Sequence, residues 1–149
     1  MTTANFHQLW QEARTRFATQ LGGLQASDLS KRLDSIPNSV GFLIRHVADV
    51  ELLFAKNVFG LKEVVVTAKT VIAKHDTGEW TDLAELLAYQ AYAYTCLQKA
   101  LRAQSEADWH TQITTKEFGA KTKAEALGRI VSHTAYHAGQ LALIQKYGV

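Results

Sequence analysis

Hydrophobic residues recur at intervals of three and four along four long stretches of this chain, which is the period of an amphipathic helix. The stretches cover residues 3–20, 39–59, 82–104 and 123–147. A helix with one apolar face must bury that face against another element. A chain of 149 residues is long enough for one domain with a substantial core. The sequence therefore predicts an all-α fold, a four-helix bundle formed by a single domain of residues 1–149.

Start and stop signals flank the periodic stretches. Thr122 and Glu125 have the spacing of a capping box, in which each side chain bonds the backbone N–H of the other residue. Asp82 and Glu85 have the same spacing, and Ser39 is a capping residue for the second helix. Glycines follow the first and second stretches and are expected to end those helices.

Two long connections lack the helical period. Residues 61–80 suggest extended pieces at 64–66 and 71–73 and a polar turn at 75–78, while residues 105–121 contain a strand-like segment at 112–115. Simple up-and-down bundles have short loops, so a long crossover between the second and third helices departs from that pattern. Long loops often form the wall of a site.

Charge and composition exclude several classes of protein. The 16 basic and 14 acidic residues are scattered along the chain, so no basic face is predicted for nucleic acid. The first residues lack the basic start and apolar run of a secretory signal, so we expect none, and no apolar run approaches the ~20 residues of a membrane span. The single cysteine, Cys96, cannot form an internal disulfide and is expected to be a small core residue. We expect a cytoplasmic protein that contacts neither nucleic acid nor membrane.

Three histidines stand out by their position on the predicted helices. His133 and His137 are four residues apart on the last helix, which stacks their side chains about 6 Å apart at Cβ. They lie at one edge of its inward stripe. Six histidines give some pair this spacing by chance roughly one time in five, so the spacing alone is weak. His46 falls inside the apolar arc of the second helix and is expected to be buried.

A shared divalent ion would explain these three positions together. Neutral histidines with hydrogen-bond partners in the core are the alternative, but three of them side by side would be costly. His46, His133 and His137 would supply three nitrogen ligands and leave a position open for water or substrate. Nitrogen ligands suit zinc, nickel, cobalt, copper or iron. Gln140 lies toward the same edge and could bond a bound water or fix a ligand.

Other polar residues near this set receive different interpretations. Asp49 points toward solvent on the His46 side, so a surface aspartate is favoured over an acceptor behind a metal ligand. Glu51 lies in the apolar arc and must be paired, which favours a tie to a helix end or loop over metal ligation. His75 is expected to be a solvated loop histidine. Tyr136 is expected to serve in packing or in a dimer contact.

The segment Asn38–Glu51, with His46 and Asp49, followed by His133–Gln140, resembles the DinB/YfiT-like superfamily of metal-dependent enzymes. The likeness covers nearly the whole chain. It implies a four-helix bundle with up-down-down-up topology, a long crossover between the second and third helices, and a homodimer. The metal-binding histidines of the family match His46, His133 and His137.

The resemblance also implies candidate activities on small molecules. Relatives include transferases that use low-molecular-weight thiols such as bacillithiol or mycothiol. In such a reaction a metal would bind the sulfur and present a thiolate to an electrophile. Zinc and nickel are the metals that we expect first. Hydrolysis by metal-activated water is the second enzymatic interpretation. A noncatalytic metal-binding or stress-response protein is the alternative from another class. A closed site with four protein ligands would favour that alternative, and an open pocket would favour an enzyme.

Overall fold

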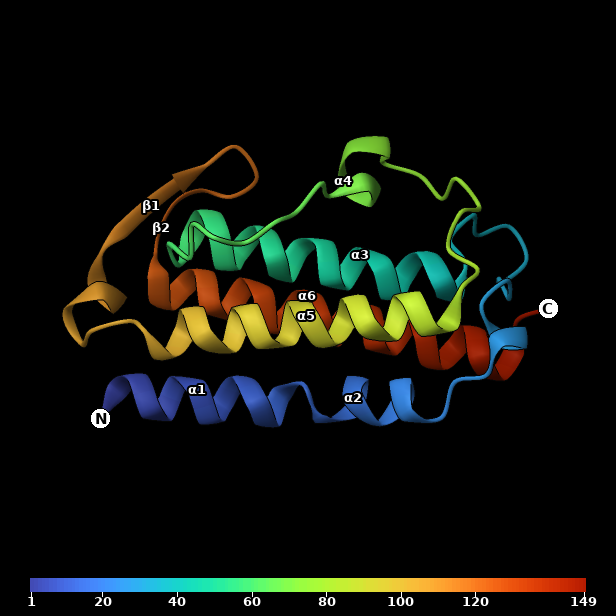
Figure 1. Ribbon diagram of the computed structural model, residues 1–149, viewed down its shortest axis with the longest axis horizontal. Coiled ribbons are helices and arrows are strands. Elements are labelled where there is room, and N and C mark those ends of the chain that lie inside the picture. The colour runs from blue at the N-terminus through green and yellow to red at the C-terminus, as the bar shows by residue number, and fades with distance from the viewer.

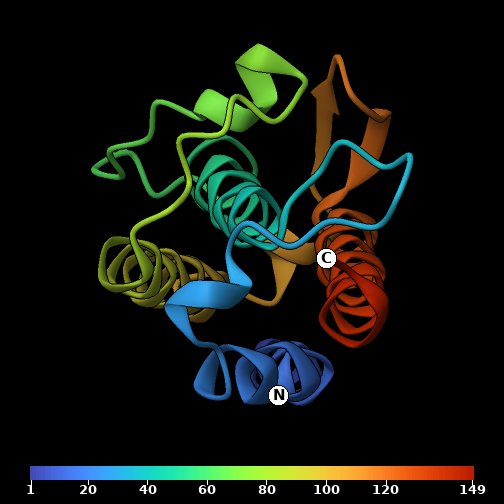
Figure 2. The same cartoon turned by 90° about the vertical axis from the view of Figure 1, so that its right-hand side faces the viewer.

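The computed structural model covers residues Met1–Val149 and is mostly helical (Figure 1). Three long helices, α3 (Val40–Leu53), α5 (Leu83–Arg102) and α6 (Lys123–Tyr147), lie alongside a fourth row made of α1 (Thr2–Ala13) and α2 (Thr15–Gly22). Seen end-on in Figure 2, the four rows surround one interior. Helix α3 contacts both α5 and α6, and the α1–α2 row contacts α5 and α6 in turn. The predicted helical class is confirmed.

The first row is broken, although the sequence predicts one helix over residues 3–20. The break lies at Arg14, between α1 and α2, and the second of these ends at Gly22 as expected. The side chain of Arg14 turns inward, and the residue is only 6% exposed. The apolar period continues across the break, so periodicity could not reveal it.

Helix α3 follows its predicted limits. Ser39 caps it by accepting a hydrogen bond from the backbone N–H of Phe42. Its last turn widens into a π-helix, η2 (Phe54–Val58), and the chain then turns at Gly60, whose φ is +81°. Arg45 and Asp49 are both buried, so the expectation that Asp49 points toward solvent is wrong. The crossover of residues 61–80 covers the side of α3 on which they lie.

The crossover runs back along the outside of α3, so that α5 begins at the end of the molecule where α3 begins (Figure 1). It contains a short helix, α4 (Lys69–Ala73), where the sequence predicted an extended piece. Left-handed residues, Ala68 (φ 52°) and Lys74 (φ 60°), flank that helix on either side. At the far end, a Cβ on Gly41 would collide with the carbonyl oxygen of Trp80. Glycine at position 41 therefore lets the crossover approach α3 closely.

The second connection contains the two remaining short features. A 3-10 turn, η3 (Ala107–His110), places Trp109 in the core and precedes β1 (Gln112–Thr115), which confirms the strand-like segment. Strand β2 (Gly119–Thr122), which the sequence did not predict, pairs antiparallel with β1. The capping box at Thr122 is formed in both directions and starts α6 at the predicted residue. An earlier 3-10 turn, η1 (Ala26–Asp28), follows α2.

None of the helices combines the length and the apolar character that crossing a bilayer requires.

Candidate metal centre

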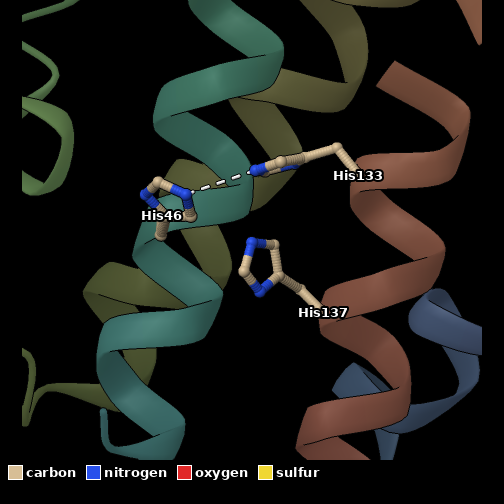
Figure 3. Close-up of side chains that lie close together, drawn as sticks. All are labelled: His46, His133 and His137. Carbon is tan, nitrogen blue, oxygen red and sulfur yellow. Dashed lines mark hydrogen bonds between the residues drawn. The ribbon is translucent and has the colours of Figure 1, made fainter. Parts of the chain in front are cut away.

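Three histidines meet across the space between α3 and α6. His46 lies in the middle of α3, and His133 and His137 lie one turn apart on α6 (Figure 3). One ring nitrogen from each lies within 4.8 Å of the other two. The closest pair is His133 Nε2 and His46 Nε2, which are 3.2 Å apart. The structure thus brings together all three histidines that the sequence singled out.

The environment of these rings keeps them neutral. All three are half-buried, so the prediction that His46 is buried is only partly right. Burial, and then the neighbouring imidazoles, lower the pKa of His46 to about 4 and that of His133 to about 3. Burial also lowers the pKa of His137, against the hydrogen bond that its Nδ1 donates to Gln140, which raises the pKa. Neutral imidazole is the form that ligates a metal ion.

Gln140 fixes the orientation of His137. Its Oε1 lies 2.6 Å from His137 Nδ1, one turn further along α6. An amide oxygen only accepts, so Nδ1 carries the proton and Nε2 keeps a lone pair. That arrangement turns the free nitrogen of His137 toward the other two rings. Gln140 therefore contacts a candidate ligand, one of the two roles that the sequence suggested for it.

A carboxylate and a hydroxyl stand behind His46. His46 Nδ1 lies 3.1 Å from Thr70 Oγ1, and that hydroxyl donates to Asp49 Oδ2 at 2.7 Å. Asp49 is 0% exposed, so its interpretation as a surface aspartate is wrong. Thr70, on α4, was not identified from the sequence, because no periodicity or motif marks residues 61–80. Only the path of the crossover brings it to α3.

The remaining predicted residues lie outside the cluster. Glu51 is fully buried and forms a two-pronged ion pair with Arg14, with Nε–Oε1 and Nη2–Oε2 distances of 2.7 and 3.0 Å. This pairing ties α3 to the break in the first row, as the sequence interpretation of Glu51 anticipated. His75 is exposed, and its Nδ1 contacts the carbonyl oxygen of Ala73. Neither residue belongs to the group that could hold a metal.

A pocket opens beside His133. Its volume is about 350 Å³, and it is lined by Val50, Phe54, Glu117, Arg129, Ser132, His133 and Tyr136. Buried apolar side chains from α3 and η2 contribute to the lining, together with an exposed ion pair, Arg129 Nη2 to Glu117 Oε1, at 3.5 Å. A larger cavity of about 550 Å³ lies between the first row and α5, and none of the three histidines lines it. Only the smaller pocket adjoins the histidine cluster.

The donor set fits a divalent transition metal. It offers three neutral nitrogens at the corners of a small triangle and no fourth protein ligand, which is the arrangement of catalytic zinc sites that keep a position open. The Nδ1 atom of His133 is buried without a hydrogen-bond partner.

Comparison with known proteins agrees with these observations. A sequence model of the DinB superfamily matches residues 9–141, a span that includes all three histidines. No curated protein matches the chain, and no solved structure matches it either.

Proposed function

The chain belongs to the DinB superfamily, and from that premise we propose that it is a metal-dependent enzyme whose ion is held by His46, His133 and His137. The observation that carries this proposal is the convergence of three ring nitrogens within 4.8 Å, beside a pocket. Zinc and nickel are the first choices for three imidazole ligands. Family membership and the geometry of the cluster both support metal binding. Together they favour a metal site over a cluster of core histidines without an ion.

The protein's own groups prepare the site for that ion. Burial keeps the imidazoles neutral, and Gln140 holds His137 with its Nε2 free. A bound divalent ion supplies Lewis acidity, which lowers the pKa of a thiol or water that reaches it. The pocket beside His133 gives a small molecule access to the cluster, and its size lies within the range of about 300–1,000 Å³ typical of ligand sites.

Two reactions are consistent with this arrangement. In the first, a low-molecular-weight thiol gives its proton to solvent, and its sulfur forms a bond to an electrophilic carbon held in the pocket. The bond from that carbon to its leaving group breaks, and the leaving group departs to solvent with the electron pair. In the second, water takes the place of the thiol and the substrate is hydrolysed. Val50 and Phe54 would contact the apolar part of the substrate, and Arg129 and Glu117 its polar end. We favour the transferase because the resemblance of the chain to thiol-dependent relatives points to it.

A noncatalytic metal-binding or stress-response protein remains the second candidate. In that case the ion would stabilise the contact between α3 and α6 without reacting. The open pocket and the absence of a fourth protein ligand in the cluster favour the enzyme.

Metal analysis of protein purified without a histidine tag tests the site. We expect about one divalent ion per chain in the parent protein and a large loss in His46→Ala and His137→Ala. His75→Ala is the matched control, since it removes an exposed histidine outside the cluster, and it should retain the metal. Equal metal content in all four proteins would reject the site.

A screen of thiols against small electrophiles tests the reaction. The metal-loaded protein should accelerate thioether formation, and His133→Ala should not. Hydrolysis of esters or amides without any thiol dependence would reject the transferase in favour of the hydrolase. No turnover, together with tight metal binding, would favour the noncatalytic protein.

We further propose that the four rows form the up-down-down-up bundle of the superfamily, as a single domain, in a cytoplasmic homodimer. The direction of the crossover supports the topology. Exposed apolar side chains of α6, Tyr136, Leu143 and Tyr147, are available for a dimer contact, and sedimentation of the purified chain tests it.

A further inference from the structure

We propose that Asp49 and Thr70 lock His46 in the tautomer whose Nε2 is free, so that the crossover positions one of the metal ligands. This inference rests on the proposed metal site for its significance. Its geometric basis, the chain of contacts Asp49–Thr70–His46, is independent of any ion. It assigns positioning roles to two residues from different segments of the chain.

Asp49 is surrounded by hydrogen-bond donors. Its Oδ1 accepts from Arg45 Nε at 3.1 Å and from the hydroxyl of Tyr89 at 2.7 Å. Its Oδ2 accepts from the backbone N–H of Thr70 at 3.0 Å and from the Thr70 hydroxyl at 2.7 Å. Arg45 is itself held between the rings of Trp80 and Tyr89, 4.9 and 3.7 Å from their centroids. The carboxylate is thus fixed from several sides and acts only as an acceptor.

The hydroxyl of Thr70, which Asp49 holds in place, determines which ring nitrogen of His46 carries the proton. A hydroxyl has a single proton, and that of Thr70 is directed to Asp49 Oδ2. If the proton turned toward His46 instead, two oxygen acceptors would face each other at 2.7 Å with no proton between them. Thr70 Oγ1 must therefore accept from His46, so the proton of the ring lies on Nδ1. The lone pair on Nε2 then faces His133.

The crossover delivers Thr70 for this contact. Thr70 is 2% exposed and is the buried residue of α4, whereas Ile72, two positions later, is 70% exposed. The left-handed residues on either side of α4, Ala68 and Lys74, turn the chain into and out of this short helix. The principal polar contact of α4 with α3 is therefore the one that reaches a candidate metal ligand.

The three histidines differ in how they are held. His137 is oriented by Gln140 from its own helix, and His133 Nδ1 has no partner. Only His46 depends on a segment distant in the sequence, because Thr70 is 24 positions away. Residues that orient metal-ligating histidines typically change metal affinity by about 10–100-fold when they are removed. We expect the same range for Thr70.

The test compares Thr70→Val with Thr70→Ser by zinc titration against a competing chelator. Valine keeps the volume and removes the hydroxyl, so zinc affinity should fall about 10–100-fold. Serine restores the hydroxyl and should bind within about threefold of the parent, which is about half of a tenfold change or less on the free-energy scale. Thr77→Val is the matched control, since it makes the same change on the exposed part of the crossover. Parent-like affinity in Thr70→Val would overturn the proposal.

A second readout does not require metal at all. Imidazole ¹⁵N shifts of the metal-free parent should show the His46 proton on Nδ1, and Thr70→Val should populate both tautomers. A parent protein with the proton on Nε2 would overturn the lock, whether or not zinc binds. Failure of the parent to bind zinc, with the proton on Nδ1, would instead reject the proposed function and leave the lock supported. Thermal unfolding of each variant checks that it is folded.

Discussion

Helix α3 carries two buried carboxylates on different sides, and their networks end differently. Glu51 is paired with Arg14, which also bonds Gln90 Oε1 at 2.7 Å, and Gln90 Nε2 closes the network on the carbonyl oxygen of Ile44 at 2.6 Å. Asp49 instead leads through Thr70 to His46, whose free nitrogen faces His133. The first network is closed within the protein. The second ends on nitrogens that have lone pairs to offer.

The difference separates stabilisation from binding. A closed ion pair holds the first row of helices against α3, and nothing outside the protein is needed to complete it. An open network leaves ring nitrogens that can bind a ligand. The two carboxylates are only two positions apart on one helix. Their different roles therefore follow from their different partners.

The largest expected effect is a loss of stability when the closed network of Glu51, Arg14 and Gln90 is disrupted. Glu51→Ala leaves the guanidinium of Arg14 buried without its counter-charge, which should lower the free energy of unfolding by about 3–5 kcal/mol. Urea denaturation measures this. Zinc affinity of the folded fraction should stay at the parent value, because Glu51 does not touch the histidines.

The double variant Arg14→Met, Glu51→Leu is the control for this prediction. Replacing both charges by apolar groups removes the unpaired charge, so most of the lost stability should return. A single variant as stable as the parent would mean that the pair does not hold the first row, and the contrast between the two networks would fail.

Glutamines occur in both networks and give a matched comparison. Gln90→Ala removes a partner of Arg14 and of the Ile44 carbonyl, so stability should fall by about 1–3 kcal/mol while zinc affinity is unchanged. Gln140→Ala frees His137 and should lower zinc affinity about tenfold with little loss of stability. Denaturation and zinc titration of both variants measure the two effects. Equal losses of stability and affinity in both would remove the distinction.

The last comparison concerns how the stability of the metal-free protein depends on pH. Burial lowers the pKa of His46 to about 4 and of His133 to about 3, from an ordinary value of 6.5. The unfolded chain therefore takes up protons first, and stability is lost as pH falls below 6.5. The loss is at most about 1.4 kcal/mol per pH unit for each imidazole.

Denaturation in a metal chelator at pH 7 and pH 5 checks this dependence. His133→Ala should be less sensitive to pH than the parent, since one of the neutral rings is gone. His75→Ala should keep the sensitivity of the parent. A parent protein whose stability is the same at both pH values would show that the histidines are not held neutral by the fold.

The sequence was sufficient for features that depend on local signals. The capping box of Thr122 and Glu125 set the start of α6 correctly, and Ser39 set the start of α3. The helical phase placed His133 and His137 on the edge of α6 that faces His46. Each of these features is determined within a few turns of helix, where periodicity and capping are informative.

The features that were missed depend on distant segments. Asp49 was assigned to solvent because a helical wheel of α3 alone cannot include the crossover that covers it. Thr70 carried no signal, since its role comes from a left-handed turn at Ala68 and a hydroxyl that reaches another helix. The break at Arg14 leaves the apolar period intact. Tertiary contacts decided all three.

The long separation between the ligands also sets an order of events during synthesis. His46 and His133 are 87 positions apart, and the second of them lies in α6, which is synthesised after the other helices described above. A nascent chain that ends before residue 133 has the Thr70–His46 contact at most and a single imidazole to offer. Metal capture would therefore follow the joining of α6 to α3, and the ion would be acquired after the other helices of this bundle have been made instead of directing their early folding.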